Sequence, residues 1–135
     1  MNRPEVSNKS KYWISKHRYY ELKHFCLQYD EWIDELSRFN AWPQTADHKA
    51  FEDLSNDIRP VESIVLRRQI LQDRISMIQK AADIADPILG KYVLEGATRL
   101  LSYEHLLARY DIPCSKDLYY SVYRRFFWIL SDMHK

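Results

Sequence analysis

Residues 101–130 read LSYEHLLARYDIPCSKDLYYSVYRRFFWIL, and they contain the clearest structural signals of the chain. Ser102 and Ser115 each precede a run of helix-forming residues, where a serine side chain can cap the first N–H groups of a helix. Between the two runs, residues 111–113 (DIP) have the composition of a turn. The predicted elements are a short helix over 103–110 and a second helix from Ser115 to about Met133.

Two helices joined by such a short turn form a helix-turn-helix when an apolar residue in the turn locks them together. Ile112 is that residue here. On a projection at 100° per residue, the second helix separates into an apolar arc and an opposite polar face. The side chains expected to face the core are Leu106, Leu107 and Tyr110 of the first helix, and Leu118, Val122, Phe126, Ile129, Leu130 and Met133 of the second, with Tyr119 and Tyr123 at the edge of the arc.

The polar face of the second helix supplies the candidate DNA contacts. Arg can bind guanine or phosphate, Ser and Tyr can donate hydrogen bonds to phosphate, and the N–H groups at a helix N-terminus attract phosphate. The same pattern also fits a core helix with a solvated basic edge, and this alternative stays open. The candidate DNA-binding residues are Ser115, Lys116, Tyr120, Ser121, Arg124 and Arg125.

The quoted stretch also resembles a known family. The segments SYEHLLARYDIP (102–113) and LYYSVYRRFF (118–127) are similar to the C-terminal end of phage and prophage late-gene transcription regulators of the ArpU/RinA type. The ends of those regulators resemble the promoter-reading region 4 of sigma factors. Residues 12–29 (YWISKHRYYELKHFCLQY) resemble the opening of small prophage proteins from low-GC Gram-positive bacteria. The resemblance implies a regulator that binds double-stranded DNA in a bacterial host cell.

The composition favours a helical chain over other fold classes. Only two glycines occur among the 135 residues, and neither an Asn-Gly nor an Asp-Gly dipeptide is present. Phosphate-binding loops of nucleotide-binding α/β folds and tight β-hairpins are therefore both disfavoured. The 19 aromatic residues can build a sizeable core. We predict an all-α single domain (1–135), a bundle of about five helices, in which a long-helix scaffold (11–85) precedes the helix-turn-helix region (87–135).

Hydrophobic spacing predicts the helices of the scaffold. Ser15 caps the first helix, residues 38–60 form an acidic loop, and Pro60 begins a helix of about 25 residues. Asp86 then caps a helix over 88–100. The expected buried residues are Val61, Ile64, Leu71, Ile75, Ile78 and Ala82 of the long helix, widened by Leu66, Ile70, Met77 and Ile84, and Ile88, Leu89, Tyr92 and Val93 of the next.

The charges are unevenly distributed along the chain. The net charge is +1, although residues 1–23 carry six basic and two acidic side chains, and residues 30–59 carry eight acidic and three basic ones. A protein that binds DNA through bulk charge would be more basic than this, so a DNA contact would be confined to a patch. The acidic stretch 30–57 is a solvated face or, alternatively, an imitation of nucleic acid.

The sequence offers neither a catalytic nor a metal-binding motif. No serine lies in a nucleophile elbow, and His24-x-Cys26 lacks a second pair of ligands at finger-like spacing. We therefore expect no enzyme activity, no cofactor and no metal. Without a signal peptide or an apolar run of membrane length, we expect a cytoplasmic protein with Cys26 and Cys114 reduced and no membrane partner.

Two other functions stay open at this point. The chain could be a phage-encoded inhibitor of a host defence nuclease (an anti-CRISPR-like role) or of RNA polymerase, with Tyr20, Trp42 and Trp128 as anchors, because aromatic and Arg side chains anchor interfaces. A structural homo-oligomer could instead use the broad apolar face of the long helix. A homodimer of the DNA-binding form would present two half-sites.

Overall fold

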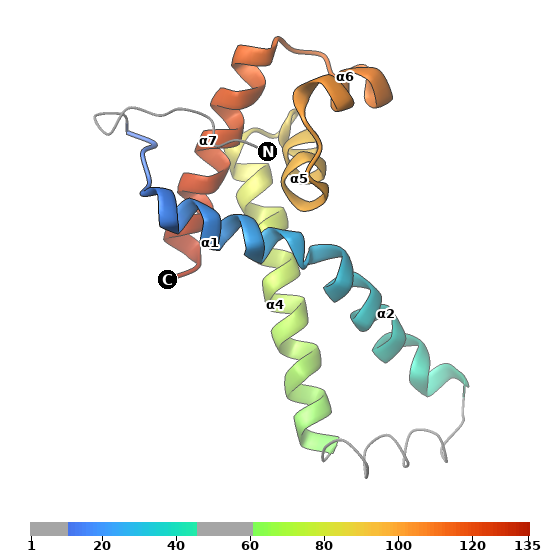
Figure 1. Cartoon of the computed structure of the whole chain (residues 1–135). Coiled ribbons are helices and arrows are strands. Elements are labelled where there is room, and N and C mark those ends of the chain that lie inside the picture. Colours follow the sequence, from blue (N-terminus) through green and yellow to red (C-terminus); the bar gives the residue numbers. More distant parts are fainter. Residues whose placement is uncertain (1–10, 46–60) are drawn as a thin grey trace. The chain divides into compact units, whose positions relative to one another are not determined.

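The computed structural model describes residues 11–45 and 61–135, and within these ranges the chain is helical without any strand (Figure 1). The predicted all-α fold is therefore confirmed. No helix in the described ranges has the length and apolar character needed to cross a membrane. The helices are α1 (Lys16–Leu27), α2 (Tyr29–Thr45), α4 (Val61–Ala85), α5 (Gly90–Arg99), α6 (Tyr103–Tyr110) and α7 (Lys116–Met133).

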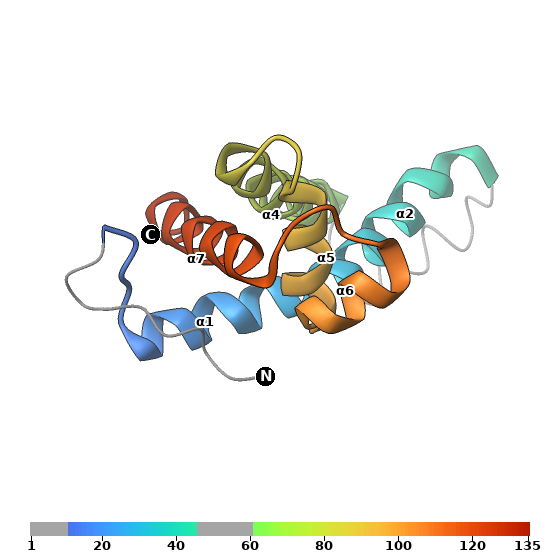
Figure 2. The ribbon, with the colours of Figure 1, turned by 90° about the horizontal axis from the view of Figure 1, so that it is seen from above.

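The described residues fall into two compact units. The first contains α1, the part of α4 from Met77 onward, and α5 to α7, whereas the second consists of residues 30–76 in α2 and the start of α4. In the first unit α1, α5 and α7 pack against one another, and α6 packs against α5. Figures 1 and 2 both show α5 between α6 and α7. All six candidate DNA-binding residues lie in this first unit.

Serine side chains begin three helices, as predicted. The Ser15 Oγ accepts a hydrogen bond from the Arg18 N–H at 3.3 Å, and the Ser115 Oγ accepts one from the Leu118 N–H at 3.2 Å. Ser102 caps α6 in the same way. These bonds satisfy N–H groups that the first turn of a helix leaves unpaired. The starts of α1, α6 and α7 therefore follow from the local sequence.

The start of α5 differs from the prediction. The Asp86 carboxylate accepts hydrogen bonds from the N–H groups of Ile88 at 2.8 Å and Leu89 at 2.7 Å, and the regular helix begins only at Gly90. Ile88 therefore belongs to a turn rather than to a helix face. Its side chain is 70% exposed, so the inward position expected for it is wrong, whereas Leu89 and Val93 are buried as expected.

The buried stripe of α4 is narrower than predicted. Ile64, Leu71 and Ile75 are buried in the second unit, which confirms the centre of the stripe. Leu66 and Ile70, expected to widen it, are exposed. Within that unit α2 is the helix available to cover α4, and one helix covers one stripe of another. In the first unit, Ile78 and Ala82 are buried and Ile84, also expected to widen the stripe, is exposed.

Helix α2 extends into the segment where the sequence predicts an acidic loop. That loop is expected over 38–60, whereas α2 continues to Thr45 and includes Pro43. A proline removes a backbone hydrogen bond from a helix, but α2 ends two residues later, so the loss falls in its last turn. The prediction is therefore wrong for residues 38–45, and its remainder, 46–60, lies outside the described residues.

Side chains also connect α2 to α4 within the second unit. Glu35 of α2 forms an ion pair with Arg67 of α4 at 2.7 Å. The guanidinium of Arg74 lies 5.4 Å from the ring centroid of the buried Trp32. These contacts add polar and cation–π interactions to an apolar stripe that is only one helix wide.

The buried arc of α7 is rotated from the predicted one. Tyr119 and Tyr123, expected at its edge, are fully buried, as is Phe127, which the prediction left out. Leu118, expected inside the arc, is 49% exposed. Because α7 packs against both α1 and α5, it buries a wider surface than a single apolar stripe. The buried residues that match the prediction are Val122, Phe126 and Leu130.

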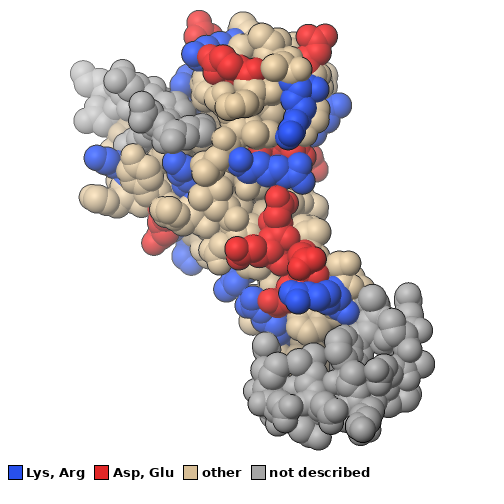
Figure 3. Space-filling view, turned by 45° about the vertical axis from the view of Figure 1, so that its right-hand side comes forward, with Lys and Arg blue, Asp and Glu red and all other residues tan. Residues whose placement is uncertain are grey.

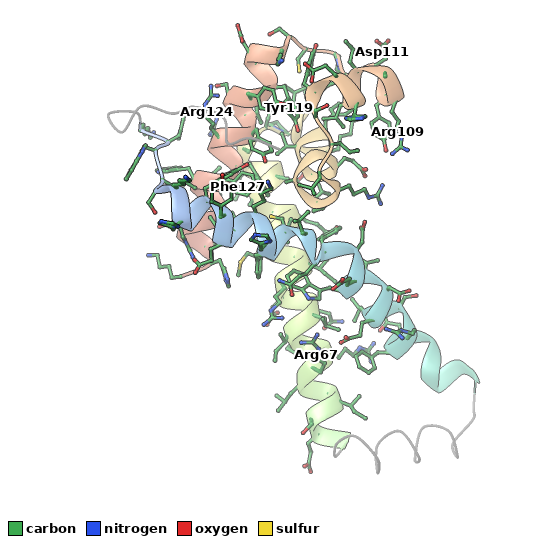
Figure 4. All side chains as sticks on the ribbon, viewed as in Figure 1. Arg67, Arg109, Asp111, Tyr119, Arg124 and Phe127 are labelled. Atoms are coloured by element: carbon green, nitrogen blue, oxygen red, sulfur yellow. The ribbon has the colours of Figure 1, made fainter. Side chains whose placement is uncertain are left out.

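Gly96 of α5 allows α7 to approach closely. A Cβ atom at position 96 would overlap the Oη of Tyr119 and would lie 3.1 Å from the carbonyl oxygen of Leu101. Figure 4 shows Tyr119 on the side of α7 that faces α5. Among the described residues, this Oη is buried without a hydrogen-bond partner. The hydroxyl thus occupies space that only a glycine leaves open.

We expect Gly96→Ala to lower the free energy of unfolding by about 1–3 kcal/mol, because it overfills a packed contact. Adding Tyr119→Phe should restore most of the loss, since it removes the overlapping Oη. Tyr119→Phe alone should leave stability unchanged or raise it, because the lost hydroxyl is unsatisfied. Urea unfolding followed by circular dichroism measures all three variants, and strictly additive effects would contradict the contact.

Candidate nucleic-acid interface

The turn between α6 and α7 consists of a left-handed residue followed by a buried one. Asp111 adopts the left-handed conformation (φ 51°, ψ 52°), and its N–H donates to the carbonyl oxygen of Leu107 at 3.0 Å. Glycine favours this conformation and is frequent in such turns. Ile112, the next residue, is buried as predicted. The backbone therefore reverses direction at Asp111 (Figure 4) and anchors the turn through Ile112.

Helix α6 buries less of its surface than the sequence suggests. Leu106 is fully buried, but Leu107 and Tyr110, also expected in the core, are 44% and 38% exposed. The reason is that this helix of eight residues packs mainly against α5, on one side. The hydroxyl of Tyr110 donates a hydrogen bond to the Glu95 carboxylate of α5 at 3.3 Å. The core positions expected for Leu107 and Tyr110 are therefore wrong.

Side chains fix α6 to the start of α7. The hydroxyl of Tyr103 donates to the carbonyl oxygen of Cys114 at 2.6 Å, and the backbone N–H of Tyr103 donates to the Tyr120 Oη at 3.4 Å. At the surface, Lys116 and Glu104 form an ion pair at 2.8 Å. These three contacts set the position of the first turns of α7.

The structure divides the six candidate residues into two groups. Three of them already interact with other parts of the protein. Ser115 caps α7, Lys116 forms an ion pair with Glu104, and the Tyr120 Oη accepts a hydrogen bond from the Tyr103 N–H. Tyr120 is half-buried, with its ring 5.0 Å from the ring of Tyr119. The second group, Ser121, Arg124 and Arg125, lies on the solvent side of α7.

The two arginines are the basic groups of this surface that are available to a ligand. Arg125 is exposed and Arg124 is half-buried, and neither forms an ion pair with any described residue. Figure 4 shows Arg124 on the side of α7 opposite to Tyr119. The burial of Tyr119 against α5 therefore directs both arginines outward.

The ion pair between Lys116 and Glu104 changes the pKa of both side chains. The hydrogen bond from Lys116 lowers the pKa of Glu104, and the same bond raises the pKa of Lys116. The pair is therefore intact at neutral pH, and is lost when the pH falls through the lowered pKa or rises through the raised one. Both side chains are exposed, so the pair stabilises the fold little, but it holds a carboxylate next to the lysine.

Positive and negative charges are mixed on the face that Figure 3 shows. In Figure 3, basic and acidic side chains are interspersed on the described part of the face, with uncharged surface between small groups of each sign. This distribution agrees with the net charge of +1. On this face, a polyanion would therefore meet a few cations rather than a continuous basic surface.

A second group of side chains adjoins the end of this surface. The rings of Tyr12 and Trp128 meet edge to face, with centroids 5.3 Å apart, and the Lys11 Nζ lies 5.7 Å and 5.8 Å from the two centroids. The sequence does not predict Lys11 as part of the site, because no spacing rule connects residue 11 with α7. The one signal was that the helical projection leaves Trp128 on the polar side, beside Arg124.

Burial changes the pKa of a few other groups in the first unit. Burial raises the pKa of the Cys26 thiol and of the Tyr123 hydroxyl. Burial is also the main cause of the raised pKa of Cys114, followed by the nearby Asp86 charge. Within the described ranges, no three His, Cys, Asp or Glu side chains gather as metal ligands would.

Neither a protein-family model nor a curated protein nor a solved structure matches this chain. The resemblance to the ArpU/RinA regulators therefore stays a prediction from the residues that carry it.

We expect Asp111→Gly to be more stable than Asp111→Ala by about 1 kcal/mol, because only glycine adopts φ near +50° without strain. This order is the reverse of that in a helix interior, where alanine is preferred. Chemical denaturation of the two variants measures the difference. Equal stabilities, or a more stable alanine variant, would show that the left-handed turn is absent in solution.

Proposed function

We propose that this protein is a DNA-binding transcription regulator that reads duplex DNA with α7, the helix after Ser115. The observation that supports the proposal most strongly is the pair Arg124 and Arg125, which point to solvent without an ion pair among the described residues. They lie on a helix whose opposite side is buried and whose start is fixed by a turn with a buried Ile112. A helix held in this way can enter a major groove while its scaffold stays outside.

Each part of the exposed face suits one kind of DNA contact. An Arg side chain can donate two hydrogen bonds to guanine or clamp a phosphate, and Ser121 can donate to a phosphate. The N-terminus of α7 adds backbone N–H groups near Ser115 and Lys116. Tyr120 contributes by bracing α6 against α7, through its contact with Tyr103.

The double substitution Arg124→Ala, Arg125→Ala should weaken binding to duplexes selected by the wild type from a random DNA pool. It should also reduce the slope of log affinity against log salt by about 2, since each lost phosphate contact removes about 0.9. Fluorescence anisotropy across a salt series measures both quantities.

The matched control is Arg38→Ala, Arg68→Ala, which removes the same charge from exposed positions in the second unit. Its effect on affinity should stay within about twofold, because neither arginine belongs to the candidate interface. The proposal is wrong if the wild type selects no duplex at low salt, or if the control weakens binding as much as the double substitution in α7.

Glu104→Gln should strengthen duplex binding severalfold, because it removes the carboxylate that competes with phosphate for Lys116. Lys116→Ala should weaken binding, and the gain from Glu104→Gln should vanish in the Lys116→Ala background. Glu31→Gln in α2 provides a control with an equal change of charge at an exposed position. An equal gain from Glu31→Gln would show that net charge alone produces the effect.

One observation favours the second candidate, a protein-binding inhibitor. Lys91, Tyr92, Glu95 and Tyr110 line a cavity of about 260 Å³ between α5 and α6. Tyrosine side chains are enriched among the anchors of protein interfaces. If this function is correct, a stoichiometric protein partner copurifies in the absence of DNA, and Tyr110→Ala releases it while Arg124→Ala does not.

A further inference from the structure

We propose that Lys11, held by the rings of Tyr12 and Trp128, is an additional phosphate contact that extends the DNA-binding face toward the C-terminal half of α7. Lys11, Tyr12 and Trp128 are called the Lys11 cluster below. The proposal rests on the proposed function, because it assigns the same ligand, the phosphate backbone of duplex DNA, to a second part of the surface.

The Lys11 cluster is continuous with the solvent side of α7. At 100° per residue, Ser121, Arg124 and Trp128 fall within one narrow stripe of the helix, and Arg125 lies at its border. The eight residues from Ser121 to Trp128 span about 10 Å along the helix axis. A duplex carries one phosphate charge per about 1.7 Å of its axis, so a stripe of this length passes several phosphates.

The charges along this stripe are complementary to a polyanion. Lys11, Arg124 and Arg125 are positive, and none of them forms an ion pair with a described residue. Of the acidic residues on α7, Asp117 lies in its first turn, and Asp132 pairs with Lys135 at 3.6 Å. Between these two carboxylates the stripe carries only positive charge.

The two rings position Lys11 without neutralising it. A lysine ammonium is attracted to the face of an aromatic ring but keeps its full charge and its N–H donors. Trp128 is half-buried in the edge-to-face contact with Tyr12, so one partner of Lys11 is fixed to α7 itself. An ammonium held in this way loses less conformational freedom when it meets a phosphate than an unrestrained lysine does.

The decisive experiment compares Lys11→Ala with Lys91→Ala in the full chain. Lys91 is a matched control, because its Nζ also lies near a ring, 5.1 Å from the centroid of Tyr92, but on α5. The probe is a fluorescent 30-base-pair duplex pool of random sequence, titrated across a salt series. Lys11→Ala should lower affinity about tenfold at 50 mM salt and reduce the salt slope by about 0.9. Lys91→Ala should change affinity by less than about twofold.

Trp128→Phe tests the role of the ring as a positioning group. It keeps an aromatic side chain but weakens the attraction to the ammonium, so it should cause part of the loss seen for Lys11→Ala. In the Lys11→Ala background it should have no further effect on the salt slope. Equal thermal unfolding midpoints for the variants and the wild type would show that folding is unchanged.

The outcomes separate this inference from the proposed function. If Lys11→Ala behaves like Lys91→Ala while Arg124→Ala, Arg125→Ala still weakens binding, the inference is wrong and the proposed function stands. If the wild type does not bind the duplex pool, both are wrong. A loss confined to a single-stranded pool of the same sequences would also overturn the inference, since it assigns Lys11 to a duplex.

Discussion

The close approach of α5 to α7 at Gly96 determines how α7 is oriented within the first unit. Tyr119 fills the space left by the missing side chain, and this contact fixes the rotation of α7 about its own axis. Once Tyr119 faces α5, the positions half a turn away must face solvent. The exposure of Ser121 and Arg125 is thus a consequence of packing on the other side of the helix. A functional surface can be set in this way by a buried residue that never touches the ligand.

The aromatic residues around this contact form a chain from α6 to α1. The ring of Tyr119 lies 6.0 Å from those of Tyr103 and Tyr123, and Tyr123 in turn lies 4.9 Å from Phe127. At the far end, the hydroxyls of Tyr19 and Tyr123 share a buried hydrogen bond of 3.0 Å. Aromatic pairs contribute beyond their buried area, and a satisfied buried polar pair favours one register of α1 against α7.

The local features of the fold could be predicted from the sequence, but the side that each helix turns toward the core could not. Serine caps and the buried Ile112 depend on residues a few positions apart, so the sequence around them was sufficient. The positions of Leu66, Leu107 and Leu118 depend on which helices pack nearby, and hydrophobic spacing does not contain that information. Lys11 could not be predicted as part of the candidate surface for the same reason, since its contact with Trp128 connects residues that are far apart in the sequence.

In the candidate site, too, contacts within one helix could be predicted and contacts between helices could not. Spacing along one helix placed Ser121, Arg124 and Arg125 on a common side, and the structure has them there. Spacing could not show that Lys116 is paired with Glu104 or that Tyr120 braces α6, because both partners lie on another helix. Half of the predicted residues are therefore engaged within the protein before any ligand arrives.

The small number of available cations has a consequence for how such a surface could act on DNA. Affinity for the phosphate backbone grows with the number of contacts, and each contact also increases the dependence on salt. Lys11, Arg124 and Arg125 would give a salt slope of about −3, which implies weak binding to DNA of random sequence at physiological salt. Useful affinity would then have to come from base contacts, or from a second copy of the chain that binds an adjacent half-site. A nearly neutral protein would in this way gain selectivity, because the non-specific part of its binding stays small.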